Sequence, residues 1–105
     1  MSDQYSVVMT TVSSDDAATS LAEALLRKQL AACIQVVPIK SHYTWKGSLQ
    51  VDSEQLLMIK SKHSNFSAIR QCIVENHSYE VPEIIEVPII AGSPEYLSWI
   101  DDVTR

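Results

Sequence analysis

The chain has 105 residues, of which 46% are hydrophobic and 20% charged, and its formal net charge is -5. This length and balance predict one globular domain, residues 1–105, with a core of its own, and they argue against a disordered chain. The negative charge argues against nucleic acid and anionic membranes as partners, because both are bound through basic patches.

The N-terminus and the cysteines indicate the compartment. The first residues, Met-Ser-Asp-Gln-Tyr, lack the positive start and apolar run of a secretory signal, and no apolar stretch reaches the length of a membrane span. Cys33 and Cys72 are far apart in sequence and form no CxxC pair, which is usual in a reducing environment. We therefore expect a cytoplasmic protein without a membrane partner.

The first two predicted elements are a strand and a helix. Residues 5–12 are rich in β-branched side chains, which favours a strand. Ser13 and Ser14 then offer a helix cap and are followed by two aspartates. Apolar residues at spacings of three and four predict one buried helix face: Ala18, Leu21, Ala22, Leu25 and Leu26.

A long hairpin is predicted next. The apolar run 33–37 is interrupted by Pro38 and resumes over residues 39–45, and a proline within a strand indicates an edge or a bulge. Lys46-Gly47-Ser48 is a turn signal, and residues 49–61 read as the returning strand. Apolar side chains occupy both parities of that strand, which predicts either a bulge or burial on both faces.

A second helix, a strand and a last helix follow. Ser64-Asn65 offers a cap for a helix whose apolar face is formed by Phe66, Ile69, Cys72 or Ile73, and His77. Residues 84–90 read as a fourth strand with Pro88 in its middle, again an edge or a bulge. Ser93-Pro94 opens a short helix whose apolar side would contain Tyr96, Leu97, Trp99, Ile100 and Val103.

This order of elements is the split βαβ pattern of an α+β fold, an antiparallel sheet with helices on one face. The hairpin strands exceed the usual five or six residues, so two helices cannot cover them. We expect the overhang, with Tyr43 and Trp45 near its tip, to pack against another subunit. The alternative is a solvated tip whose aromatic residues pair only across the strands.

The polar loop at residues 77–83 is the main candidate for a binding site. It presents His77, Tyr79, Glu80 and Glu83 immediately before an apolar strand, and Val81 is pushed toward extended geometry by the proline that follows it. The alternative is structural: Tyr79 plugs the turn, and His77 terminates a helix near its negative dipole end.

Other residues point to no catalytic site. Only two glycines are present, Gly47 and Gly92, which disfavours a phosphate-binding loop, and no nucleophile–base pair can be named. We therefore expect no enzymatic activity. Lys60 reads as an edge gatekeeper or an anion contact, and His63 reads as a solvated side chain.

Four segments together resemble the CutA divalent-cation-tolerance family: residues 30–34 (Leu-Ala-Ala-Cys-Ile), 41–47 (Ser-His-Tyr-Thr-Trp-Lys-Gly), 77–84 (His-Ser-Tyr-Glu-Val-Pro-Glu-Ile) and 96–100 (Tyr-Leu-Ser-Trp-Ile). The resemblance implies a ferredoxin-like βαββαβ subunit with a long hairpin between its second and third strands and a short C-terminal helix. It further implies a homotrimer similar to the PII signalling proteins, whose clefts between subunits bind small effectors. Family members are associated with tolerance to copper and other divalent cations.

The resemblance also implies ligands. Some bacterial members have copper assigned to a cysteine of the first strand and to two adjacent histidines. Here His77 matches the second histidine, Asn76 stands at the first, and Met9 stands near the cysteine. A copper site would therefore use His77 and Met9, and it would bind more weakly or be completed by different ligands. The cleft residues implied by the family pattern are Cys33, Trp45, Lys60, Tyr79 and Glu83.

The resulting hypothesis is a trimeric cytoplasmic protein that binds copper or another divalent cation. A second hypothesis is a trimeric sensor of an anionic metabolite or nucleotide, based on Lys60, Tyr79 and Trp45 near a cleft. A third is a trimeric scaffold that binds partners and no small ligand.

Overall fold

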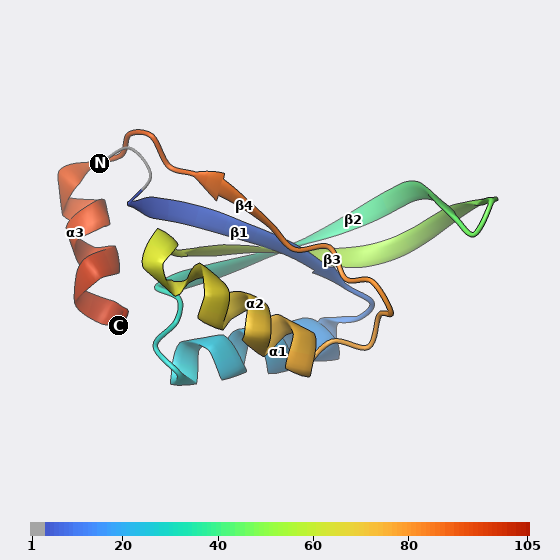
Figure 1. The fold of residues 1–105 in the computed structure, drawn as a ribbon, viewed down its shortest axis with the longest axis horizontal. Coiled ribbons are helices and arrows are strands. Elements are labelled where there is room, and N and C mark those ends of the chain that lie inside the picture. The colour runs from blue at the N-terminus through green and yellow to red at the C-terminus, as the bar shows by residue number, and fades with distance from the viewer. Residues whose placement is uncertain (1–3) are drawn as a thin grey trace.

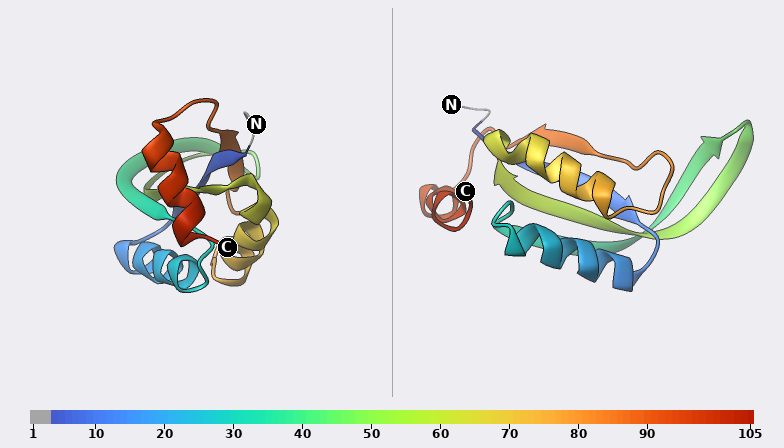
Figure 2. Two further views of the ribbon diagram at one scale, coloured as in Figure 1. Left: turned by 90° about the vertical axis from the view of Figure 1, so that its left-hand side faces the viewer. Right: turned by 60° about the horizontal axis from the view of Figure 1, so that its bottom comes forward.

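The computed structural model describes residues 4–105 and confirms the α+β fold with an antiparallel four-stranded sheet. Its elements are β1 (Tyr5–Val12), α1 (Asp15–Arg27), β2 (Cys33–Trp45), β3 (Ser48–Lys62), a 3-10 turn (His63–Asn65), α2 (Phe66–Glu75), β4 (Ile85–Pro88) and α3 (Pro94–Val103). The strand order is β2-β3-β1-β4. Helices α1 and α2 lie together on one face of the sheet, while α3 lies across one end (Figures 1 and 2).

The core lies between the sheet and the two long helices. Alternate residues of β1, among them Ser6, Val8 and Thr10, are buried on the helix side. Helix α1 begins where the Ala17 amide donates to the Ser14 hydroxyl at 3.1 Å. Its buried face contains Ala18, Leu21 and Leu25 as predicted.

One predicted core position of α1 is wrong. The side chain of Leu26 is 45% exposed, whereas Leu25 is fully buried. Successive helical residues are rotated by about 100°, so the neighbour of a centrally buried leucine turns toward solvent.

The hairpin turn is a two-residue turn with both central residues at positive φ, Lys46 at 50° and Gly47 at 81°. Such turns match the right-handed twist of the strands they join. The β2–β3 register runs unbroken from Cys33 opposite Lys60 to Trp45 opposite Ser48, so the bulge considered for β3 is not present. Leu57 is fully buried on the helix side. The apolar side chains at the alternate positions of β3 lie on the opposite, open face of the sheet.

The outer half of the hairpin has no third strand beside it. Strand β1 pairs with β3 only from Gln55 to Lys62, and residues 48–54 pair with β2 alone. The arm therefore projects beyond the rest of the sheet (Figure 1). Leu49 on this arm is 88% exposed and Val51 is 56% exposed. The long overhang predicted from the sequence is confirmed.

Two boundaries differ from the sequence predictions. Helix α2 ends at Glu75 with Asn76 as its cap, so His77 lies beyond the helix rather than on its apolar face. Strand β4 covers only Ile85–Pro88, with Pro88 as its last residue instead of its middle one. A proline has no amide hydrogen to donate to a ladder, and β4 is an edge strand, as expected.

The last helix is only partly buried. Proline is its first residue, as predicted, but the Ser93 hydroxyl donates to the Glu95 carboxylate at 2.9 Å rather than capping the backbone. Ile100 is fully buried, while Tyr96 and Trp99 are about two-fifths exposed. Within residues 4–105 no helix has both the length and the apolar character needed to cross a membrane.

Candidate binding cavity

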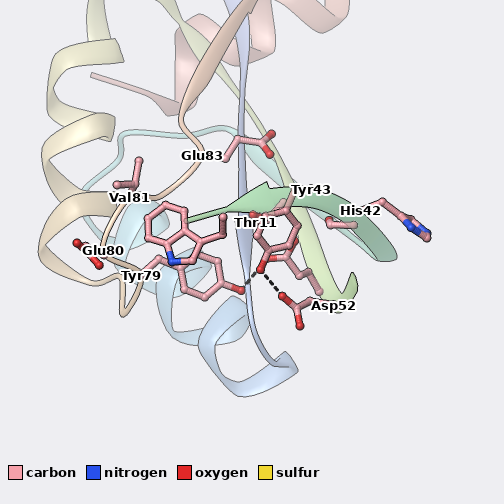
Figure 3. A pocket seen from close by; sticks show the side chains of 11 residues that line it. Thr11, His42, Tyr43, Asp52, Tyr79, Glu80, Val81 and Glu83 are labelled. Atoms are coloured by element: carbon pink, nitrogen blue, oxygen red, sulfur yellow. Dashed lines mark hydrogen bonds between the residues drawn. The ribbon is translucent and has the colours of Figure 1, made fainter. Parts of the chain in front are cut away.

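A cavity of about 600 Å³ lies where the hairpin arm leaves the sheet. Its wall is formed by the end of β1, the outer parts of β2 and β3, and the loop that follows α2 (Figure 3). The lining carboxylates are Asp52, Glu54, Glu80 and Glu83, and the lining aromatic residues are Tyr43, Trp45 and Tyr79.

Two tyrosine–carboxylate pairs organise this cavity. The Tyr79 hydroxyl donates to Oε2 of Glu54 at 2.6 Å, and Glu54 is only 8% exposed. The Tyr43 hydroxyl donates to the Asp52 carboxylate in a more exposed position. The two hydroxyls and the Asp52 carboxylate converge in the cavity (Figure 3). The loop after α2 is thereby tied to the hairpin.

The environment raises the pKa of both tyrosines. For Tyr79 the largest cause is burial, and the hydrogen bond to the Glu54 carboxylate adds to it, since both disfavour the phenolate. For Tyr43 the hydrogen bond to Asp52 comes first, followed by burial. Both phenols are therefore protonated donors at neutral pH, which is the form that these hydrogen bonds need.

His77 ties the loop after α2 to the end of β1. Its Nε2 lies 2.6 Å from the carbonyl oxygen of Thr11 at the end of β1, and its Nδ1 lies 3.1 Å from the Tyr79 amide nitrogen. A carbonyl only accepts, so Nε2 carries the hydrogen, and Nδ1 accepts from the Tyr79 N–H. The His77 and Tyr79 rings also touch, with centroids 4.5 Å apart.

The cavity is acidic. Four carboxylates line it, and His42 is the one basic side chain among its described lining residues. Lys46 lies at the edge, where its Nζ is 3.9 Å from a Glu80 oxygen, but both side chains are exposed. Carboxylates grouped around one concave space attract cations and repel anions.

The structure brings some of the predicted site residues together and separates others. Trp45, Tyr79 and Glu83 line this cavity of the single chain. Cys33 and Lys60 do not line it: they are paired across β2 and β3 toward the other end of the hairpin. Met9 also lies outside the lining, opposite Met58 in the sheet.

One further interpretation is wrong. Lys60 is no edge gatekeeper, because β3 is an interior strand, and its Nζ lies 5.5 Å from the centroid of the Tyr96 ring. The His63 side chain is 59% exposed, as expected, and its Nδ1 also lies 2.8 Å from a Glu86 oxygen.

Sequence reasoning missed the most buried member of the site, Glu54, and its neighbour Asp52. The available signal was their spacing of two on a strand, which places both side chains on one face. Within residues 4–105 no group of three or more His, Cys, Asp or Glu side chains is placed to hold a metal ion. A complete metal site would therefore need side chains from another copy of the chain, or a rearrangement.

Comparison with known proteins gives the family. The model of the CutA1 divalent ion tolerance protein family matches residues 6–103. The chain is 43% identical over 100 residues to "Protein CutA, chloroplastic" of Arabidopsis thaliana, covering 94% of this chain but 55% of that protein. It thus spans about half the length of that relative.

Two further matches cover both partners almost completely. The "Divalent-cation tolerance protein CutA" of Thermus thermophilus is 39% identical, with 93% of this chain and 96% of that protein covered. The crystal structure of CutA1 from Oryza sativa superposes with a TM-score of 0.94 at 40% identity and covers 99% of this chain and 96% of that one. The chain belongs to the CutA1 divalent ion tolerance protein family.

Proposed function

We propose that this chain is a divalent-cation tolerance protein that works as a homotrimer in the cytoplasm. We propose copper as its main cation. Membership of the CutA1 divalent ion tolerance family supports the role in general terms. The observation that carries the proposal for this chain is the acidic cavity, with Asp52, Glu54, Glu80 and Glu83 around one space.

The chemistry of the cavity favours a divalent cation over other small ligands. Its donors are carboxylate and phenol oxygens, which suit divalent metals better than Cu(I). The sulfur donors Cys33 and Met9 lie elsewhere on the sheet. We therefore propose Cu(II) as the form of copper that binds here.

The same chemistry disfavours the rival hypothesis of an anionic metabolite. That hypothesis placed Lys60 at the cleft, whereas Lys60 lies against Tyr96 of α3. An anion entering the cavity would meet four carboxylates and no lysine or arginine among the described lining residues.

The unsupported arm supports the proposed assembly. Residues 48–54 have one neighbouring strand, both edges of the sheet are open within one chain, and Leu49 and Val51 are exposed. Neighbouring copies would cover these side chains and pair with the open edges. They would also bring further donors to the cavity, where residues 4–105 of one chain hold no complete metal site.

Two free thiols support the proposed cytoplasmic location, because Cys33 and Cys72 form no disulfide. We propose a binding role without a catalytic step. A fluorescent fusion that colocalises with an exported marker would contradict the location.

Equilibrium dialysis against Cu(II) tests the cation proposal. The wild-type protein should bind Cu(II), and replacing the two hairpin carboxylates by Asp52→Asn and Glu54→Gln should weaken binding at least about tenfold, the effect of about 1.4 kcal/mol. The matched control removes the same charges far from the cavity, with Glu23→Gln on α1 and Asp102→Asn on α3. Equal weakening in both double variants, or tighter binding of ATP than of Cu(II), would reject the proposed site.

A further inference from the structure

We propose that His77 is a positioning residue and not a metal ligand: it fixes the loop after α2 so that Tyr79 reaches Glu54. The role of the cavity in cation binding rests on the function proposed above. The arrangement of His77 itself does not depend on it.

Both ring nitrogens of His77 are already used. Nε2 donates to the Thr11 carbonyl at 2.6 Å, and Nδ1 accepts from the Tyr79 amide at 3.1 Å. A neutral imidazole has one donor and one acceptor nitrogen, so this arrangement fully satisfies one tautomer. A metal ion binds the lone pair of the unprotonated nitrogen, and here that lone pair faces the Tyr79 N–H.

Ligation would therefore have a structural cost. A metal at Nδ1 would displace the Tyr79 amide, and a metal at Nε2 would need the other tautomer, which turns an N–H toward that amide. Neighbouring ligands are also absent: the Asn76 side chain donates back to the Cys72 carbonyl at 2.8 Å, and the part of the chain that the structure describes holds no three-residue ligand group. His77 and its surroundings do not fit a metal centre.

The geometry instead fits a positioning role. Residues 76–84 form no helix or strand, so few backbone hydrogen bonds fix their path. His77 bridges this loop to the end of β1, and its ring contacts the ring of Tyr79. The Tyr79 hydroxyl then reaches the buried carboxylate of Glu54 on β3. His77 and Tyr79 together thus link β1, the loop and the hairpin at the cavity.

Nitrogen-15 NMR of the histidine rings tests the arrangement directly. In the wild-type protein at neutral pH, His77 should show a protonated Nε2 and an unprotonated, hydrogen-bonded Nδ1. Adding one equivalent of Zn²⁺ or Cu(I), both diamagnetic, should leave these resonances in place. The opposite tautomer, or a metal-induced shift of either nitrogen, would overturn the proposal.

Variants separate positioning from general stability. His77→Ala should speed hydrogen exchange of the Tyr79 amide about tenfold, because that amide loses its acceptor. His77→Asn should stay within about threefold of the wild type, because an asparagine oxygen can accept from the amide two residues on. His42→Ala, in the same cavity, should change nothing at Tyr79. Exchange that is equal in the wild type and in His77→Ala would contradict the role.

The two proposals fail in different ways. If the wild-type protein takes up no cation in dialysis, the proposed function is wrong, while the tautomer and the exchange rates still decide the role of His77. If His77→Asn keeps the Tyr79 amide protected but loses one bound metal per chain, His77 is a ligand and the inference is wrong.

Discussion

The hydroxyl of Tyr79 lies 2.6 Å from Oε2 of Glu54 and joins two segments that are 25 residues apart in sequence. Glu54 stands at the point where β1 stops supporting the hairpin, one residue beyond the last β1–β3 pair. A carboxylate that is 8% exposed would lack a donor without this phenol. The pair therefore both closes the cavity and stabilises the junction of the arm with the sheet.

Replacing Tyr79 by phenylalanine should destabilise the protein. The change removes the donor to Glu54 while keeping the ring, and a buried acceptor without a partner costs about 1–3 kcal/mol. Urea denaturation measures the loss. Tyr43→Phe is the matched control, because its partner Asp52 is exposed and should lose less. A larger loss for Tyr43→Phe would show that burial of Glu54 is not the cause.

The ionisation of Tyr79 should occur late in an alkaline titration. Burial and the Glu54 carboxylate raise the pKa of its phenol above the ordinary value of about 10. A raised acid pKa means that this stabilising contribution is complete below about pH 10 and is lost as the pH rises through the folded-state value.

Absorbance at 295 nm measures this ionisation. The difference between the absorbance titration curves of the wild type and Tyr79→Phe should rise at a higher pH than the absorbance of the other tyrosines. A difference signal centred at or below about pH 10 would contradict the burial of this phenol.

Replacing Thr10 by valine should stabilise the fold. Thr10 is fully buried on the helix side of β1, and its hydroxyl has no hydrogen-bond partner among residues 4–105. An isosteric apolar side chain removes the desolvation cost, about 1 kcal/mol.

Ser61→Ala should act in the opposite direction. The Ser61 hydroxyl donates to the Leu30 carbonyl at 2.6 Å and accepts from the Asn65 amide, so its removal leaves buried groups without partners. Thermal or urea unfolding of both variants measures the two changes in stability. A destabilised Thr10→Val would mean that its hydroxyl has a partner, such as a buried water.

The order of elements could be predicted because its signals are local. Alternation in residues 5–12, the serine cap of α1 and the Lys46-Gly47 turn each depend on a few neighbouring residues. Pro38 correctly indicated an edge strand, since an interior strand needs every amide.

The site was predicted only in part, because it depends on pairings distant in sequence. The loop residues Tyr79 and Glu83 were identified from their own segment. Glu54 became a site residue only through its contact with that loop, which no local pattern contains. The interpretation of Lys60 as an edge gatekeeper is wrong because it requires an edge strand, and the sequence near Lys60 does not show that β3 is an interior strand.

The proposed cation site depends most on neighbouring copies that cover the hairpin arm and complete the cavity. Light scattering coupled to size-exclusion chromatography at micromolar concentration measures this directly. The predicted result is a single species of three times the chain mass. A folded protein with the mass of one chain would contradict the proposed assembly, because residues 48–54 would then remain uncovered in solution.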